Sequence, residues 1–311
     1  MLATFTGAGF SYWSARLPLA KDLFDFQIEP FGVREINRLS KVRDLWKAWV
    51  AFHPTDPTEA FIYDTIHRDN KSSRAILWYL VRRLSEPYLW YETYANRTRR
   101  HVLMIDENRV FERPGIKRAQ NFLTWLSRFG LQGVITTNYD LIIEYALGTK
   151  GFNYGDVGEI LQGRGPYPVS QWHNPVRLTG RVPLAKVHGS ISWDSENRYT
   201  DGRRGLTGNA LIVAPDPDKS QPIELIAVWK LGAQILNKAK NLIVFGFGFN
   251  QYDNALLSFL GDNGSGLEKV LLIDVSPKFE IAKQLWPSAD IQSADPPEEG
   301  TENIGSWLKT L

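Results

Sequence analysis

The sequence predicts an α/β fold with a doubly wound, mainly parallel sheet and a large helical insertion. Short, almost uninterrupted apolar runs alternate with helical segments in the second half of the chain, which is typical of a parallel sheet covered by helices on both faces. The chain also starts on an apolar strand, Leu2 to Phe5, that leads directly into two glycines. Its 311 residues, 43% of them hydrophobic, are enough for one large Rossmann-like domain over residues 1–311.

The first turn, residues 6–11 with the sequence TGAGFS, has the composition of a phosphate-binding loop. A strand that turns on Gly-x-Gly brings backbone N–H groups close to a phosphate, and the N-terminus of the following helix adds positive potential. The third glycine of the dinucleotide-binding pattern is absent, because Tyr12 stands in its place. Taken alone, the motif is equally consistent with a purely structural turn.

Residues from about 19 to 130 form the predicted insertion, which is rich in Trp, Arg, Leu and Glu at helical spacing. The stretch from Val33 to Phe52 carries apolar residues at steps of three and four, which predicts an amphipathic helix that ends before Pro54. Further helices are expected from Thr58, over Ser72 to Leu84, and over Ile116 to Phe129.

After residue 130 the pattern changes to the strands and helices of the sheet. The apolar runs predict buried strands at Val134–Thr136, Leu184–Val187, Ala210–Val213, Leu242–Phe245 and Val270–Ile273. Helices are expected around 223–240 and 253–260. The residues from 148 to 181, rich in glycine and proline, are expected to form a long loop.

Composition and charge exclude several classes of protein. With 36 basic and 34 acidic residues the net charge is +2, so direct nucleic-acid binding is not indicated, and the basic segments Arg97–His101 and 203–204 are more typical of solvated surface. The absence of cysteine rules out disulfides, thiolate metal sites and a cysteine nucleophile. With neither a leader pattern nor an apolar run of about 18 residues, we expect a cytoplasmic protein with no membrane partner.

A polar or glycine-rich group follows five of the predicted strands. These groups are Gly7-Ala8-Gly9-Phe10-Ser11, Thr136-Thr137-Asn138-Tyr139-Asp140, His188-Gly189-Ser190, Gly246-Phe247-Gly248-Phe249-Asn250 with Asp253, and Asp274. Each has a plain structural explanation, such as a helix cap at Asn138 or Asp140, or a satisfied loop histidine at His188. Because ligands bind beyond the carboxyl ends of the strands in open α/β sheets, one bound dinucleotide accounts for all five groups together.

The order of these groups resembles the sirtuin-like NAD-consuming fold. Gly-Ala-Gly-x-Ser, Thr-x-Asn-x-Asp, a strand-terminal His-Gly and a late Gly-x-Gly before Asp follow one another as in that family, over residues 2 to about 274. The Thr-Thr-Asn-Tyr-Asp form is similar to the bacterial NAD-hydrolase branch, whose members act in antiphage defence. Protein-deacylating sirtuins carry a small domain on a four-cysteine zinc site, and this chain, with no cysteine, is expected to have no zinc ribbon and no metal.

The resemblance implies an NAD+ glycohydrolase that releases nicotinamide and ADP-ribose, with NAD+ as its substrate. In this interpretation Asn138 positions the attacking water or the ribose hydroxyls, and His188 acts as general base. Asp140 contacts the nicotinamide carboxamide, and Asp274 lies near the adenine. The other implied binding residues are Gly7, Ala8, Gly9 and Ser11 at the pyrophosphate, Gly246, Gly248 and Asn250 at the phosphates and the adenosine ribose, and Thr137 and Asp253.

Other functions remain open at this level. One is a non-catalytic subunit that binds NAD or ADP-ribose within a larger assembly, and another is a sirtuin-type protein deacylase or ADP-ribosyltransferase. A dehydrogenase is disfavoured, because the chain lacks both the third glycine and an acidic strand end about 20 residues after the first turn. Because loss of NAD is toxic to a cell, we expect gating through a homo-oligomer or a partner protein, such as an ATPase, an Argonaute-like protein or another sensor.

Overall fold

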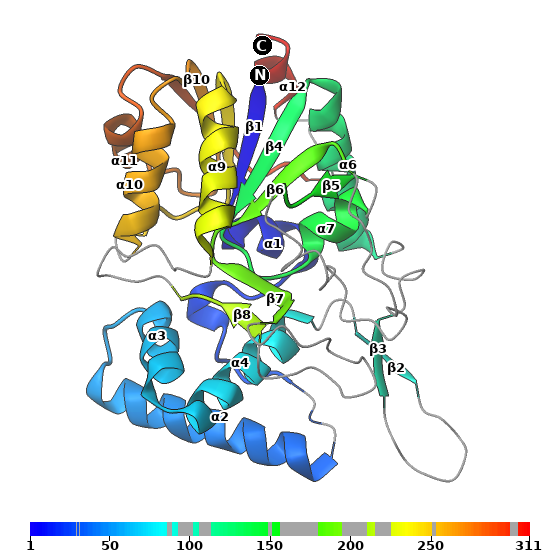
Figure 1. Cartoon of the computed structure of the whole chain (residues 1–311), viewed down its shortest axis with the longest axis vertical. Coiled ribbons are helices and arrows are strands. Elements are labelled where there is room, and N and C mark those ends of the chain that lie inside the picture. Colours follow the sequence, from blue (N-terminus) through cyan, green and yellow to red (C-terminus); the bar gives the residue numbers. More distant parts are fainter. Residues whose placement is uncertain are drawn as a thin grey trace.

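The computed structural model describes residues 1–28, 30, 32–85, 89–92, 102–105, 113–148, 151–155, 180–194, 210–214, 225–250, 253–298 and 304–311. Its centre is a seven-stranded parallel sheet in the order β11-β10-β9-β1-β4-β6-β5 (Figure 1). The strands are β1 (Leu2–Thr6), β4 (Leu131–Thr136), β5 (Phe152–Asn153), β6 (Val182–Lys186), β9 (Asn241–Phe245), β10 (Lys269–Ile273) and β11 (Asp290–Ala294). The doubly wound parallel sheet predicted from the sequence is therefore confirmed.

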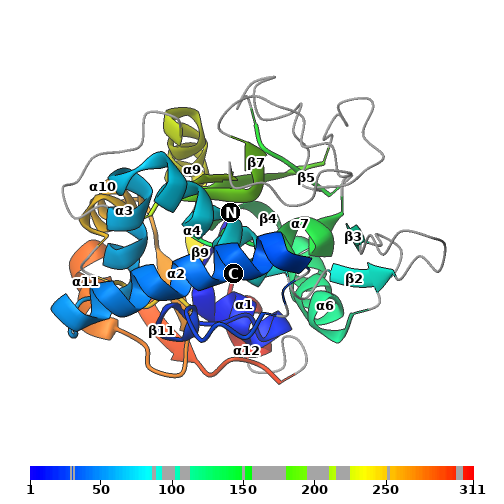
Figure 2. The same cartoon turned by 90° about the horizontal axis from the view of Figure 1, so that it is seen from below.

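Helices cover both faces of this sheet. They are α1 (Ala8–Ala15), α6 (Pro114–Arg128), α7 (Ile142–Leu147), α9 (Ile226–Lys238), α10 (Asn254–Asn263), α11 (Phe279–Leu285) and the short C-terminal α12 (Gly305–Leu308). Figure 2 shows α1 and α6 on one side of β4 and β9, with α9 and α10 on the other. This cover explains why β1 and β9 are mostly apolar and are buried along their whole length. No helix in the described ranges is long and apolar enough to span a lipid bilayer.

A group of helices lies beyond the carboxyl ends of the sheet strands (Figure 1). It consists of the 3-10 turn η1 (Ala20–Asp22) and the helices α2 (Gly32–Phe52), α3 (Thr58–Arg68) and α4 (Asn70–Ser85), close to the bounds expected from the sequence. Aromatic rings hold it together: Phe24 stacks on Trp46 and on Tyr79, with centroids 4.7 and 5.2 Å apart, and meets Phe61 edge-on at 4.9 Å. Aromatic residues of the insertion therefore join the same apolar core that contains the sheet, with Trp46 packed against it.

Two antiparallel strand pairs lie outside the main sheet, and one of them corrects a prediction. The run Ala210–Val213 was expected in the parallel sheet, but β8 (Ala210–Ile212) pairs antiparallel with β7 (Gly189–Asp194). Both strands contact α4, so burial against the helices accounts for the apolar residues of β8. The other pair, β2 (Leu89–Glu92) with β3 (Val102–Ile105), was not predicted, and neither was β11, whose sequence DIQSA is too polar to mark a buried strand.

Candidate functional site

The strand register places the predicted strand-end groups along one edge of the sheet. Thr6, the last residue of β1, is level with Thr136 of β4 and with Phe245 of β9, and Lys186 and Ile273 end the next strands outward in the same row. The chain builds one side of the sheet through β4, β5 and β6 before it crosses to β9 on the other side of β1. The strand order thus reverses between β1 and β9, which is where open α/β sheets bind ligands.

The first turn packs directly against the end of β9. The N–H of Gly7 donates to the carbonyl of Phe245 at 3.0 Å, and the N–H of Gly9 donates to the carbonyl of Gly246 at 2.9 Å. A Cβ on Gly9 would lie 2.6 Å from the Cα of Gly246, and a Cβ on Gly7 would lie 2.6 Å from the Gly246 carbonyl oxygen. Glycine is therefore needed for contact between two backbone segments, and these two N–H groups are already used. Pyrophosphate binding by this turn stays a prediction.

The loop after β9 is shaped by two residues in the left-handed region of backbone space. Gly246 has a φ of 64°, and Phe249 has a φ of 49°, which is uncommon for a residue with a side chain. Phe249 is buried and is held by its ring contacts with Phe247 and Trp286, whose centroids lie 4.9 and 6.2 Å away. Aromatic packing thus supports the left-handed backbone conformation of Phe249.

The side-chain amide of Asn138, in the loop after β4, is held by the first turn. Its Nδ2 donates to the carbonyl oxygen of Gly7 and to Oγ of Ser11, both at 2.8 Å. Because the Gly7 carbonyl can only accept, this bond settles which amide atom is the nitrogen. Both amide hydrogens therefore point into the protein. No described residue donates to Oδ1 of Asn138, which leaves this oxygen as the acceptor that a ligand or water can use.

Ser11 joins Asn138 to Asp140. The Ser11 hydroxyl donates to Oδ2 of Asp140 at 2.6 Å, while Oδ1 of Asp140 accepts the N–H of Ile142, the first residue of α7, at 3.0 Å. Asp140 is only 5% exposed, so these two bonds satisfy a carboxylate that is otherwise shielded from water. Leu141, and not Asp140, is the N-cap of α7, so the bond from Ile142 to Asp140 is a local turn contact and not the helix cap that the sequence allowed. Its role at the nicotinamide stays a prediction.

A buried ion pair that the sequence analysis did not single out lies beside this loop. Nζ of Lys186 is 2.9 Å from Oε1 of Glu144, and it also donates to the carbonyl oxygen of Asp140. Tyr154 donates its hydroxyl to the same Glu144 oxygen at 3.1 Å. Burial raises the pKa of the Glu144 carboxyl above its ordinary value, although the Lys186 ammonium acts in the opposite direction. The available signal was a lysine within the apolar run Leu184–Val187.

His188 pairs with Asp253 across the same edge. Nε2 of His188 lies 3.0 Å from Oδ2 of Asp253, and both residues are about 5% exposed. Asp253 immediately precedes α10, where its Oδ1 accepts the N–H of Leu256 at 3.4 Å. In the sheet, β1 and β4 lie between β6, which precedes His188, and β9, which precedes Asp253. The contact therefore joins loops from the two halves of the fold, and the sequence did not reveal it.

The remaining residues implied in NAD binding also follow strands that end at this edge. The exposed or half-buried ones among them are Ala8, Thr137, Gly248, Asn250 and Asp274. Asp274 follows β10, and its Oδ1 accepts the N–H of Ser276 at 2.9 Å, which is a local turn contact. Their contacts with NAD stay predictions. The basic segments Arg97–His101 and 203–204 lie outside the described residues.

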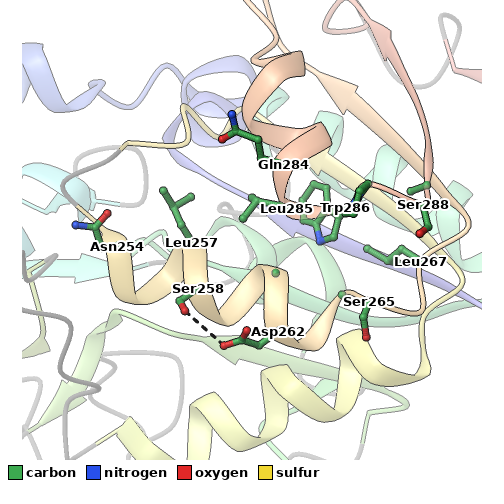
Figure 3. Close-up of a pocket in the computed structure, with 14 residues that line it drawn as sticks. Asn254, Leu257, Ser258, Asp262, Ser265, Leu267, Gln284, Leu285, Trp286 and Ser288 are labelled. Carbon is green, nitrogen blue, oxygen red and sulfur yellow. Dashed lines mark hydrogen bonds between the residues drawn. The ribbon is translucent and has the colours of Figure 1, made fainter.

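A pocket of about 640 Å³ lies between α10 and α11 (Figure 3). Its lining includes Asn254 at the start of α10 and Trp286 after α11, and the Ser258 hydroxyl donates to Asp262 at 3.4 Å along its wall. The described lining contains none of the predicted site residues. Nor do the described ranges contain a cluster of three or more His, Asp or Glu side chains that could hold a metal ion.

Comparisons with known proteins find one matching family model. Residues 132–284 match the SIR2-like domain. A solved structure from a study of the mechanism and regulation of Sir2 enzymes is 13% identical to this chain, with a TM-score of 0.41. The match covers 93% of this chain and 85% of the chain in that structure. A Sir2 structure with an inhibitor, 2'-O-acetyl-ADP-ribose and a deacetylated peptide is 12% identical, with a TM-score of 0.40. That match covers 100% of this chain and 91% of the chain in the Sir2 structure. No curated protein sequence matches the chain. The matched region contains Asn138, His188 and Asp253.

Proposed function

The chain carries a SIR2-like domain and belongs to the sirtuin-like family, and we propose on this basis that it is an NAD+ glycohydrolase that releases nicotinamide and ADP-ribose. The observation that carries the proposal is the fixed amide of Asn138, whose two hydrogens are bound by Gly7 and Ser11 and whose oxygen has no donor among the described residues. An acceptor held in one orientation at the strand-reversal point is suited to bind a water or a ribose hydroxyl.

The chemistry requires two groups, one to orient water and one to receive its proton. Hydrolysis breaks the bond between the nicotinamide nitrogen and the ribose carbon, and the bonding electrons leave with nicotinamide as a neutral ring. The oxygen of water forms the new bond to that carbon, and one proton is released. Asn138 Oδ1 accepts a hydrogen bond from the water, and the imidazole of His188 receives the proton and passes it to solvent.

The charge around the first turn supports placement of the pyrophosphate there. The first turn of α1 has no acidic residue, and Ala8 at its N-terminus is exposed. A helix N-terminus carries partial positive charge and stabilises an anion. The Asp140 carboxylate accepts hydrogen bonds from Ser11 and from the N-terminus of α7, so both of its oxygens already have donors.

The direct test is to incubate the full chain with NAD+ and to quantify nicotinamide and ADP-ribose by chromatography. We expect His188→Ala and Asn138→Ala to lower the turnover by about 10²–10⁴-fold, the usual contribution of a positioned acid–base group. The exposed residues His67 and Asn237 offer matched controls, and His67→Ala and Asn237→Ala should retain the wild-type rate. Full activity of either site variant, with an unchanged circular dichroism spectrum, would contradict the proposal.

The same assay separates the other functions. NAD binding in calorimetry without release of nicotinamide would indicate a non-catalytic binding subunit. Release that depends on an acetylated peptide would indicate a deacylase, and transfer of labelled ADP-ribose to protein would indicate a transferase.

We extend the proposal to a role in antiphage defence, in which the enzyme depletes cellular NAD+ once a partner or oligomerisation activates it. This extension is supported by the Thr-Thr-Asn-Tyr-Asp form of residues 136–140, which resembles the bacterial NAD-hydrolase branch. It predicts that bacteria producing the wild-type chain, together with its genomic neighbours, lose NAD+ upon infection and restrict the phage. Cells producing the His188→Ala chain should keep their NAD+ and allow the phage to replicate.

A further inference from the structure

The contact between His188 and Asp253 assigns a role to Asp253 other than binding NAD. We propose that Asp253 is a positioning residue that keeps the proton of the neutral His188 imidazole on Nε2, so that Nδ1 is the basic nitrogen. The catalytic role of this arrangement rests on the proposed glycohydrolase function. The position of the proton on Nε2 does not depend on that function and can be measured separately.

The geometry of the pair determines the tautomer. Nε2 of His188 and Oδ2 of Asp253 are 3.0 Å apart, within hydrogen-bond distance. An ionised carboxylate can only accept, so the nitrogen that faces it must carry the hydrogen. A neutral imidazole has one N–H, and its other nitrogen is then the one that can accept a proton. No described residue hydrogen-bonds Nδ1 of His188, so it is available to a substrate or water.

Both partners of this pair are fixed by their own backbones. The carbonyl of His188 accepts the N–H of Val213 at 2.9 Å, and the carbonyl of the preceding Val187 accepts the indole N–H of Trp229, also at 2.9 Å. On the other side, the N–H of Asp253 donates to the carbonyl of Asn250 at 3.0 Å. These bonds hold the main chain at both partners of the pair, which favours a lasting contact between the imidazole and the carboxylate.

The helix cap makes the substitution Asp253→Asn informative. Oδ1 of Asp253 accepts the N–H of Leu256, and this donor will also select the oxygen of an asparagine. The amide nitrogen of the asparagine is then directed at His188, where it must donate to Nε2. That bond moves the imidazole proton to Nδ1 and removes the basic nitrogen from the ligand side. Asparagine is as good a helix cap as aspartate, so α10 should remain folded.

An NAD-binding role and a positioning role predict different kinetics. If Asp253 bound NAD+, Asp253→Asn would mainly raise KM. If Asp253 sets the tautomer, kcat falls by about 10²–10⁴-fold while KM stays close to the wild-type value, as expected when an acid–base group is held in the wrong protonation state. Asp253→Ser offers a second variant, because serine also caps helices but is too short to replace the carboxylate at His188.

Asp69 provides the matched control. It precedes α4, where its Oδ1 accepts the N–H groups of Lys71 and Ser72, both at 2.8 Å. Asp69→Asn is therefore the same change at another helix N-terminus. It should leave both kcat and the His188 spectrum unchanged.

The experiment combines ¹⁵N NMR of histidine-labelled protein with steady-state NAD+ hydrolysis. The chain has five histidines, and the His188 signals are those lost in His188→Ala. We expect a protonated Nε2 and an unprotonated Nδ1 in the wild-type protein, exchanged in Asp253→Asn together with the loss of kcat. A wild-type spectrum with the proton on Nδ1 would overturn the inference without any variant having to fold, and so would a rise in KM with unchanged kcat in Asp253→Asn. A third outcome is that the imidazole proton lies on Nε2 in the wild type and moves to Nδ1 in Asp253→Asn, but the wild-type protein releases no nicotinamide. In that case the positioning role stands and the glycohydrolase proposal fails.

Discussion

Replacing Gly246 by alanine tests whether the first turn and the end of β9 must touch at backbone distance. A Cβ at this position would lie 2.3 Å from the nitrogen of Phe10 and 2.4 Å from the carbonyl carbon of Gly9. Both are main-chain atoms, so no side chain can rotate to relieve the clash. The φ of 64° adds a second cost, because residues with a Cβ adopt this conformation unfavourably.

The two costs give the expected loss of stability. The left-handed conformation costs about 1–2 kcal/mol for a residue with a Cβ. Overpacking adds about 1–3 kcal/mol when the neighbours have to shift. We therefore expect Gly246→Ala to lower the free energy of unfolding by about 2–5 kcal/mol, a large share of the roughly 5–15 kcal/mol of an ordinary domain.

Urea unfolding followed by circular dichroism measures this loss, and Gly248→Ala is the control. A Cβ on Gly248 meets no atom within 4 Å, and the residue is exposed, so this variant should stay within about 0.5 kcal/mol of the wild type. Equal unfolding midpoints for the two variants would refute the reasoning, because the backbone contact would then tolerate a side chain.

The buried pair of Lys186 and Glu144 gives the remaining predictions. Lys186→Met should destabilise the fold by about 3–5 kcal/mol, since it leaves a carboxylate without its partner, and adding Glu144→Leu should recover most of the loss in urea unfolding. The raised pKa of Glu144 means that the folded state binds more protons than the unfolded state above the ordinary value of 4.5. This contribution to stability is therefore complete at low pH and declines as the pH rises through the folded pKa. Unfolding series at several pH values should show the decline in the wild type but not in the double variant; the same slope in both would assign it to other groups.

Hydrophobic pattern predicted the fold well where it reflects burial within the sheet. The runs at β4, β9 and β10 are apolar because helices cover both faces, and period-3.6 patterns marked the helices of the insertion in the same way. The same signal failed at β8, whose apolar residues are buried by α4 instead, and at the polar edge strand β11. An apolar run reports that a segment is buried, but it does not report its partner.

The site was predictable to the level of the sheet edge and no further. Residues that follow parallel strands, such as Asn138 and His188, must gather at one edge because the register aligns the strand ends. The side-chain pairs His188–Asp253 and Lys186–Glu144 depend on the conformations of the loops and helices that follow the strands. The spacing of strands along the chain does not predict these conformations.

The central position of β1 has a consequence for how the chain folds during synthesis. Leu2 pairs with Leu131 of β4 on one side and with Asn241 of β9 on the other, so β1 needs a partner strand that is synthesised much later than itself. Until residues 241–245 leave the ribosome, β1 exposes an unpaired apolar edge of the kind that recruits other chains. Pairings this far apart in sequence also form slowly. We therefore expect the unpaired edge of β1 to be open to non-native pairing until β9 has been made. A fragment that begins at residue 132 lacks the central strand β1.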